Sequence, residues 1–380
     1  MKIAHLSDLH LGKNINNYSM LEEQKYILGQ ISQILERENI KVLLIAGDIY
    51  DKSVPPTEAI NFFDEFLVNL SKKSIQIFII GGNHDSGERL SFGADLMALG
   101  GVHIAKPFNK DTKDIKPYTL KDEFGAVNIY LLPFVRPANV KAAFENEDIT
   151  GYTQAVKTVI DNMKVDTSLR NILVTHQFVT GAEKCDSEQI SVGGADNVDS
   201  FVFDPFDYVA LGHLHGPQYI GRETLRYCGS PLKYSFSEVK HNKSLTVVNL
   251  NAKGDIKLQL IPLKALHDWQ DLKGTYEELI SKDFYDKLDT KNYFRITLTD
   301  EEEVDFALEK LRNVYPNIMS LAYDNKRTAY NAEVGTLEQE KSKTPLEVFA
   351  ELYKKQNNDK LNDQQIKHLE KLMQSIWEEN

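Results

Sequence analysis

Short apolar runs separated by helix-like stretches constrain the fold of this chain more than any other feature. Each run is rich in Ile, Val and Leu and is closed by a glycine or a polar residue, as expected for strands buried on both faces of a sheet. The runs are Ile3 to Leu6, Val42 to Ala46, Ile75 to Ile80, Ile129 to Leu132, Ile172 to Val174 and Tyr208 to Leu211. Helical periodicity fills intervals such as Met20 to Glu38 and Glu58 to Leu70, and the run from Ser244 to Leu263 adds late strands. This alternation predicts a layered α/β domain with β-sheets flanked by helices.

The pattern changes near residue 266, and 380 residues are enough for two or three domains. We interpret residues 1–265 as the main domain and 266–330 as a small α+β capping domain, with helices over 277–288 and 301–314 and strands over 293–298 and 318–323. Residues 331–343 are polar and predict a linker. Thr344-Pro345-Leu346-Glu347 then has the form of a capping box with proline at the first helical position, so residues 344–380 predict a helix–loop–helix.

The composition excludes several classes of protein. No apolar run approaches the roughly 20 residues that cross a bilayer, the N-terminus lacks the apolar core of a secretory signal, and two cysteines cannot form a disulfide framework. We therefore expect a cytoplasmic protein with no membrane partner. The net charge of −12 argues at first against nucleic acid. However, residues 1–265 hold 28 Lys and Arg against 32 Asp and Glu, so most of the acidic excess lies elsewhere.

Polar side chains that can hold a metal follow the predicted strands. They are Asp8, His10, Asp48, Asn83, His176, His213 and His215, with His84 beside Asn83. Ligands of open α/β sheets bind outside the carboxyl ends of the strands, so we expect these groups to share one crevice. Imidazoles, carboxylates and an amide oxygen without a thiolate favour a divalent ion such as manganese over a structural zinc. The candidates are too many for one ion and suit two ions about 3.5 to 4 Å apart, with Asp48 as the bridging candidate.

Taken singly, each of these residues has an ordinary structural explanation. Gly47-Asp48 and Asn83 are typical of turns, and a lone His176 is more often a hydrogen-bonded histidine at the end of a strand. It is their joint order that favours a metal centre. The remaining histidines have no partner at ligand spacing and are expected to be structural: His5, His103, His241, His267 and His368.

Five ordered motifs resemble those of the calcineurin-like metallophosphoesterases. They are HLSDLHLG from residue 5, GDIYD from residue 47, GGNHDSGERLSFG from residue 81, THQF from residue 175 and GHLHGPQ from residue 212. The resemblance implies that Asp8, His10, Asp48 and His215 hold one Mn²⁺ ion and that Asp48, Asn83, His176 and His213 hold the other. It also implies that His84 is the catalytic acid or transition-state stabiliser. Asp51 occupies the place of an acid that orients the catalytic histidine in related metallophosphatases.

Within that superfamily the chain resembles the nuclease subunits of bacterial ATP-dependent DNA repair complexes. The similarity extends through VGGADNVDSFVFDPFDYVALGHLHGPQ and YCGSPLKYSFSE, and it covers residues 1–265 closely. It implies a Mn-dependent exonuclease on double-stranded DNA and endonuclease on hairpins and single strands, acting in repair, recombination and replication. It also implies a homodimer within a heterotetramer.

The partner implied by this resemblance is a coiled-coil ATPase that binds residues 344–380. ATP use would belong to that partner, because the chain has no GxxxxGK[ST] loop. The apolar stripe of the predicted helix pair could instead fold back on the main domain. Two other functions fit the same fold: a phosphoesterase acting on small nucleotides or phosphoproteins, and a non-catalytic scaffold.

Overall fold

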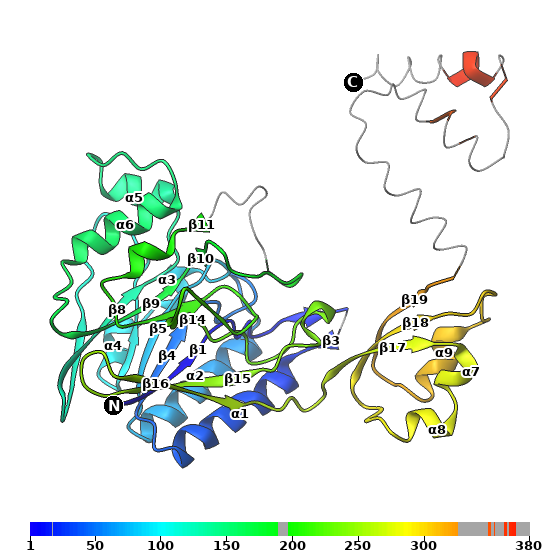
Figure 1. Cartoon of the computed structure of the whole chain (residues 1–380), viewed down its shortest axis with the longest axis horizontal. Helices are drawn as coiled ribbons and strands as arrows, with labels where there is room; N and C mark the ends of the chain where they lie inside the picture. The colour runs from blue at the N-terminus through cyan, green and yellow to red at the C-terminus, as the bar shows by residue number, and fades with distance from the viewer. Residues whose placement is uncertain are drawn as a thin grey trace.

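The computed structural model describes residues 1–16, 18–188, 197–325, 349–350, 353, 361–362 and 365–369. Two six-stranded sheets form the body of the main domain (Figure 1). The first has the order β16-β15-β1-β4-β5-β6, in which β1, β4, β5 and β6 run parallel, β15 is antiparallel to β1, and β16 is antiparallel to β15. Its strands are β1 (Lys2–Leu6), β4 (Val42–Ala46), β5 (Gln76–Ile80), β6 (Val102–Ile104), β15 (Ser244–Leu250) and β16 (Ile256–Pro262).

The second sheet has the order β13-β14-β12-β9-β8-β7. Its central strands β8, β9, β12 and β14 are parallel, and an antiparallel strand closes each edge. The strands are β7 (Tyr118–Asp122), β8 (Gly125–Leu132), β9 (Arg170–His176), β12 (Tyr208–Gly212), β13 (Gln218–Ile220) and β14 (Arg222–Tyr227). Each run of apolar residues expected as a strand therefore lies in one of the two sheets.

Three apolar layers hold the main domain together. Helices α1 (Leu21–Arg37) and α2 (Thr57–Lys72) pack on the outer face of the first sheet, and α5 (Pro137–Ala143) and α6 (Tyr152–Met163) pack on that of the second. The inner faces of the sheets meet through β-branched and aromatic side chains such as Val42, Phe78 and Ile172. The strands are buried on both faces as expected, but the cover is helical on one side and a second sheet on the other.

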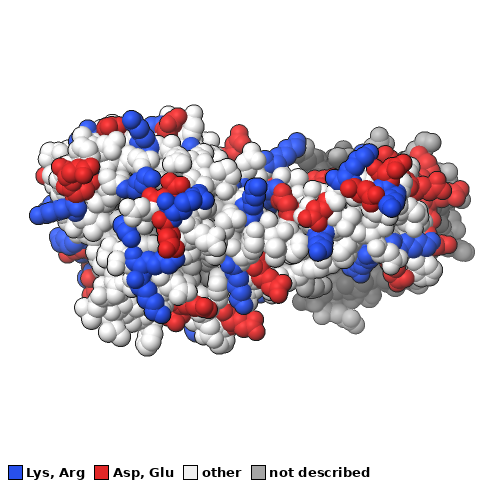
Figure 2. Space-filling view, turned by 90° about the horizontal axis from the view of Figure 1, so that it is seen from below, with Lys and Arg blue, Asp and Glu red and all other residues white. Residues whose placement is uncertain are grey.

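Shorter elements connect these layers. Near the first sheet lie β2 (Asn14–Ile15), β3 (Tyr18–Ser19), α3 (Gly87–Leu90) and α4 (Ala94–Ala98). Near the second lie β10 (Phe178–Val179), β11 (Asn197–Val198) and the 3-10 helix η1 (Ser200–Phe203), whereas the 3-10 helix η2 (Phe236–Glu238) packs against Trp269. Lysine and arginine side chains lie among aspartate and glutamate side chains over the face seen from below (Figure 2). No described helix is long and apolar enough to span a membrane.

The segment after residue 266 forms a smaller unit with its own core (Figure 1). Three parallel strands, β17 (Trp269–Gly274), β18 (Tyr293–Leu298) and β19 (Ile318–Tyr323), carry the short helices α7 (Tyr276–Leu279), α8 (Lys282–Tyr285) and α9 (Ala307–Arg312). Contacts such as that between His267 Nδ1 and Glu23 Oε1, at 2.6 Å, join it to α1.

Two expectations for this unit were wrong. The helix expected over 277–288 is broken into α7 and α8 at Ser281, whose hydroxyl donates to the carbonyl of Glu278 at 2.7 Å. The helix expected over 301–314 begins only at Ala307, because Phe306 before it has a left-handed φ of 54°. Strand β17 was not foreseen. The expected linker 331–343 and most of 344–380 lie outside the described residues. Within 344–380, the described residues 349–350, 353 and 365–369 are helical.

Candidate metal centre

Loops at the carboxyl ends of five strands from both sheets meet at one place. Asp8 and His10 follow β1, Asp48 follows β4, Asn83 and His84 follow β5, His176 ends β9, and His213 and His215 follow β12. Neighbouring loops are tied by main-chain hydrogen bonds, such as those from Asp8 N to Gly47 O and from His10 N to Asp48 O, both 3.0 Å. The structure thus brings together all seven residues predicted as metal ligands, with His84 among them.

The backbone here is held in unusual conformations. Asp8, His10, Asp48 and His213 all have positive φ angles, of 54°, 44°, 49° and 104°. Such angles are disfavoured for residues with a Cβ and persist only where the surrounding structure imposes them, which is common at functional sites. Glycine is also required beside the ligands: a Cβ at Gly82 would collide with the carboxylate of Asp48.

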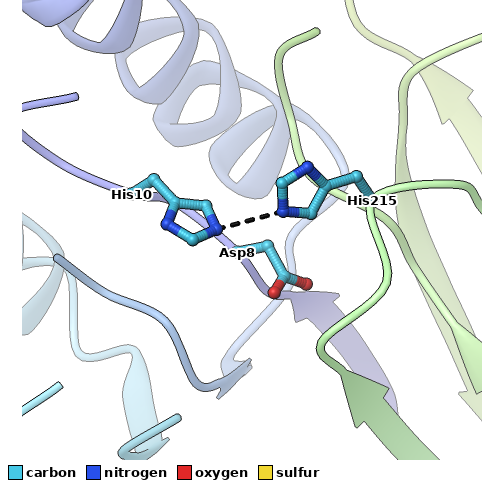
Figure 3. A group of neighbouring side chains, drawn as sticks. All are labelled: Asp8, His10 and His215. Carbon is cyan, nitrogen blue, oxygen red and sulfur yellow. Dashed lines mark hydrogen bonds between the residues drawn. The ribbon is translucent and has the colours of Figure 1, made fainter. Parts of the chain in front are cut away.

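A first cluster contains Asp8, His10 and His215 (Figure 3). The two rings point their Nε2 atoms toward each other at 3.0 Å, and the Asp8 carboxylate lies beside them. All three side chains are almost completely buried. Burial raises the pKa of Asp8 to about 6, against the opposing pull of His176 and His215. A carboxylate and two imidazole nitrogens confined in this way form a donor set for a divalent cation.

A second cluster surrounds Asn83. Its Oδ1 lies 3.0 Å from His176 Nε2 and 2.9 Å from His213 Nδ1. Asp48 Oδ2 lies 3.4 Å from His176 Nε2 and 3.8 Å from His10 Nε2, so this carboxylate stands between the two clusters. The position is one from which a single carboxylate can reach two ions.

The hydrogen bonds of His176 provide a test of whether a cation fits. Its Nδ1 donates to the carbonyl of Ala46 at 2.8 Å, so in the neutral ring Nε2 is a bare acceptor that faces the oxygens of Asn83 and Asp48. Acceptors facing acceptors require a proton or a metal ion between them. Burial alone would lower the pKa of His176, but the Asp48 carboxylate outweighs burial and raises it to about 9. The donor set therefore fits a divalent metal, with a proton in its place when none is bound.

His84 is half-buried beside His10 and Asp48 and is held by two hydrogen bonds. Its main-chain N–H donates to Asp48 Oδ1 and its ring Nδ1 donates to the carbonyl oxygen of Asp51, both at 2.9 Å. The expected orienting contact from the Asp51 carboxylate is therefore replaced by one from the Asp51 main chain. The carboxylate itself pairs with Lys13 Nζ at 2.7 Å and lies 3.7 Å from His10 Nδ1.

Asp85 supports the site and was overlooked in the sequence. Its carboxylate accepts hydrogen bonds from the main-chain N–H groups of Ile49, Tyr50 and Gly82 at 3.1, 3.0 and 2.9 Å. These bonds fasten the loop after β4 to the loop after β5, and so fix Asp48 relative to His84. Its place directly after Asn-His in the third motif was the available signal.

A second supporting group, also overlooked, lies behind His215. Ser187 Oγ is 2.8 Å from His215 Nδ1 and donates to Glu238 Oε1 at 2.6 Å, and Lys243 Nζ donates to Glu238 Oε2 at 2.5 Å. Glu188 Oε1 accepts from the main-chain N–H of His215 at 2.6 Å. No ligand spacing marks these residues, because they meet only through the tertiary fold. Partners of this kind fix the tautomer and orientation of a metal-binding histidine.

The sheets and the donor set at their carboxyl ends define the class of protein as a metallophosphoesterase. The family model described as calcineurin-like phosphoesterase matches residues 1–217, more than half of the chain. A second model, described as the C-terminal domain of the type 5 capsule protein repressor, matches residues 263–357. A crystal structure of a dimetal phosphatase from Danio rerio is 12% identical, with a TM-score of 0.44, and covers 68% of this chain and 95% of that one.

A curated relative matches over almost the full length. It is the D subunit of the nuclease SbcCD from Staphylococcus epidermidis, which is 34% identical over 376 residues, covering 97% of this chain and 98% of that protein. The chain therefore belongs to the calcineurin-like phosphoesterase family and, within it, to the same family as this SbcCD nuclease component.

Proposed function

We propose that this protein is a Mn-dependent DNA nuclease, the catalytic subunit of an SbcCD-type ATP-dependent repair and recombination complex. The observation that carries the proposal is the convergence of seven residues with nitrogen or oxygen donors from both sheets on one site, six of them buried and Asn83 half-buried, in a chain that matches a nuclease subunit over 97% of its length. Every ligand position is filled, which argues against a non-catalytic scaffold.

Two groups of residues would hold two divalent ions. Asp8, His10 and His215 belong to one, Asn83, His176 and His213 to the other, and Asp48 to both. When bound, such ions lower the pKa of a coordinated water toward neutrality and neutralise charge on a phosphodiester. Nitrogen and oxygen donors without a thiolate suit Mn²⁺, with Mg²⁺ as the next candidate.

The contribution of His84 follows from its hydrogen bonds. With Nδ1–H fixed on the Asp51 carbonyl, a second proton on the cationic ring belongs to Nε2, which can give it to the leaving oxygen or stabilise charge on the phosphoryl group. The bond from the His84 main-chain N–H to Asp48 Oδ1 holds this residue beside the proposed bridging carboxylate. Asp51 acts through its main chain in this scheme, as a positioning residue.

Replacing His84 by glutamine tests the catalytic proposal. The purified protein with its ATPase partner, Mn²⁺ and a hairpin or duplex DNA should cut the DNA, and His84→Gln should lower the rate by about 10²- to 10⁴-fold, the usual contribution of a positioned acid. Metal affinity measured by calorimetry should change little, because His84 is not among the proposed ligands. His103→Gln is the matched control, since His103 stacks on Phe78 away from the site.

The substrate class can be separated in the same assay. A preference for double-stranded or hairpin DNA over a small phosphodiester would support the nuclease. Rapid hydrolysis of the small diester with no cutting of DNA would support the alternative, a phosphoesterase of small nucleotides or phosphoproteins.

The proposed protein partner is an SbcC-type ATPase, bound through residues 344–380. The apolar residues expected along these helices have little other sequence to cover them, and helices of this kind dock in grooves of other proteins. Removal of the residues after Lys343 should abolish co-purification with the ATPase and leave the binding of Mn²⁺ unchanged. Undiminished co-purification would contradict this assignment.

We also propose a homodimer formed by an apolar surface near α2 and α4. Phe92, Leu96 and Leu99 are 85%, 74% and 85% exposed, and Val54, which lines the same cavity as Phe92, is 65% exposed. Large exposed side chains gathered in this way mark protein interfaces. Light scattering should give the mass of a dimer for the wild type and of a monomer for Phe92→Asp combined with Leu99→Asp.

A further inference from the structure

A cavity lies next to the loop that carries His215 and is lined by Gly216 and Pro217. It has a volume of about 690 Å³ and is walled by β13 and β14 of the second sheet, by the edge of the first sheet at β15 and β16, and by residues 181–185. The proposed metal ligands do not line it. Cavities of this size commonly accept ligands as large as a nucleotide.

A buried arginine that lacks a counterion opens into this cavity. Arg226 on β14 is only 9% exposed, its Nε has no hydrogen-bond partner, and none of the described carboxylates pairs with it. Its guanidinium lies over the ring of Tyr219, with Cζ 5.7 Å from the ring centre. On the same strand, Arg222 donates to two main-chain carbonyls, of Asp207 and Phe203. Burying a charge without a partner is costly, so a bound anion would stabilise the Arg226 guanidinium.

Two further polar groups, Ser244 and His241, line the cavity wall. Ser244 is 7% exposed and its Oγ has no hydrogen bond, whereas His241 Nδ1 forms no hydrogen bond but lies 3.9 Å from Glu238 Oε2. A guanidinium, a hydroxyl and an imidazole together form a set of donors suited to a phosphate group. Two buried polar groups without a hydrogen bond in one cavity, Arg226 Nε and Ser244 Oγ, are unusual, because buried polar atoms are nearly always paired.

The rim of the cavity adds charge and an aromatic surface. Lys184 and Lys240 line it and are exposed, and among the lining residues only Glu183 is acidic. Tyr219 is 50% exposed and presents a ring on which a base can stack. The cavity therefore combines a buried phosphate-binding group with a flat surface for a nucleobase.

We propose that this cavity binds a nucleoside monophosphate unit, with its phosphate on Arg226 and its base on Tyr219. The unit is either a free mononucleotide or the phosphorylated end of a DNA strand, since the chemistry presented to the cavity is the same. The inference rests on the proposed nuclease function, because a nuclease binds the ends of DNA strands and releases nucleotides. Binding itself requires no metal and no hydrolysis.

Calorimetry on the full-length protein in EDTA tests the proposal. The probes are dAMP, deoxyadenosine, inorganic phosphate and a 5′-phosphorylated trinucleotide. The wild type should bind dAMP better than phosphate and should not bind deoxyadenosine measurably. Arg226→Met should weaken dAMP by about 10- to 100-fold, the loss expected for hydrogen bonds to a charged group. Lys257→Met, a loss of one exposed charge on β16, is the matched control and should leave the affinity unchanged.

Thermal unfolding separates binding from a structural role of Arg226. Because Met removes an unpaired buried charge, ligand-free Arg226→Met should melt no lower than the wild type. A lower melting temperature, absence of dAMP binding, or unchanged binding by the variant would overturn the proposal. Equal affinities for phosphate and dAMP would overturn the nucleotide assignment. Tighter binding of the trinucleotide would identify the strand end as the ligand, and equal binding the free nucleotide.

Failure of this proposal is distinguishable from failure of the nuclease proposal. Binding of dAMP in EDTA without any DNA cleavage in Mn²⁺ would refute only the nuclease proposal. Cleavage of DNA without binding of dAMP would refute only the proposed nucleotide site at Arg226.

Discussion

Glu238→Gln tests whether the buried network behind His215 supports the metal centre. The side chain of Glu238 is fully buried and accepts hydrogen bonds from Ser187 Oγ, Tyr234 N and Lys243 Nζ at 2.6, 3.1 and 2.5 Å. Burial by itself would raise the pKa of Glu238. The Lys243 ammonium and His215 outweigh burial and hold the pKa well below its usual value, so the carboxylate is charged.

The expected loss follows from what glutamine leaves unpaired. Glutamine keeps the shape but removes the charge opposite the buried Lys243, and breaking a buried pair costs about 3 to 5 kcal/mol. Lys243 retains bonds to His215 O and Ser230 Oγ, each 2.8 Å, so we expect the lower end, about 3 kcal/mol. In a domain of this size that corresponds to a fall in Tm of about 6 to 12 °C.

The metal centre should weaken in parallel. Groups that orient a metal-binding histidine typically change metal affinity by about 10- to 100-fold when removed. Calorimetric Mn²⁺ titration and thermal unfolding of the metal-free protein measure the two effects separately. Glu36→Gln is the control, because Glu36 pairs with Lys73 at 2.9 Å with 67% of its side chain exposed, and its loss should cost at most about 1 kcal/mol. A Glu238→Gln protein that melts and binds Mn²⁺ like this control would refute the reasoning.

Two other predictions follow from the contacts. Arg170 forms a bidentate pair with Asp122 that holds the pKa of Asp122 below its usual value, so this stability is present above about pH 4 and is lost as the pH falls further. Urea denaturation of Arg170→Met should show a loss of about 3 kcal/mol at pH 7 and a weaker dependence on acid, and equal acid sensitivity would contradict it. Asp51→Asn should release Lys13 but keep the main-chain carbonyl that orients His84. The rate of single-turnover cleavage should therefore fall by less than about 10-fold, which is less than the usual contribution of a catalytic acid. A loss as large as that of His84→Gln would show that the Asp51 carboxylate is needed.

The positions of the strands and of the donor set could be predicted because both depend on local pattern. Asp8, Asp48 and Asn83 each follow a run of buried apolar residues, and the carboxyl ends of parallel strands meet at one edge. The division of these strands between two sheets could not be predicted. Apolar runs such as Val42 to Ala46 and Ile172 to Val174 are equally buried on both faces, and nothing in their composition tells whether a helix or a second sheet covers them.

The supporting residues were missed for a different reason. Asp85 accepts hydrogen bonds from Ile49 and Tyr50, which are 36 and 35 residues earlier in the sequence. Glu238 accepts one from Ser187, which is 51 residues earlier. Spacing in the sequence carries no record of such pairings. The contact between Asp51 and His84 also depends on the fold: the main-chain carbonyl of Asp51, and not its carboxylate, accepts from the ring, and spacing in the sequence cannot distinguish the two.

The acidic composition and the metal centre belong to one electrostatic arrangement. Asp8 and Asp48 are no more than 2% exposed, and charges so placed must be compensated. Protonation of His176 and the raised pKa of Asp8 supply compensation in the metal-free chain, and two divalent cations would supply about four positive charges in their place. That number offsets the small acidic excess of residues 1–265, where 28 Lys and Arg face 32 Asp and Glu. A formal charge that omits bound cations therefore underestimates the attraction of this site for a phosphodiester, and a net charge of −12 is compatible with a nuclease.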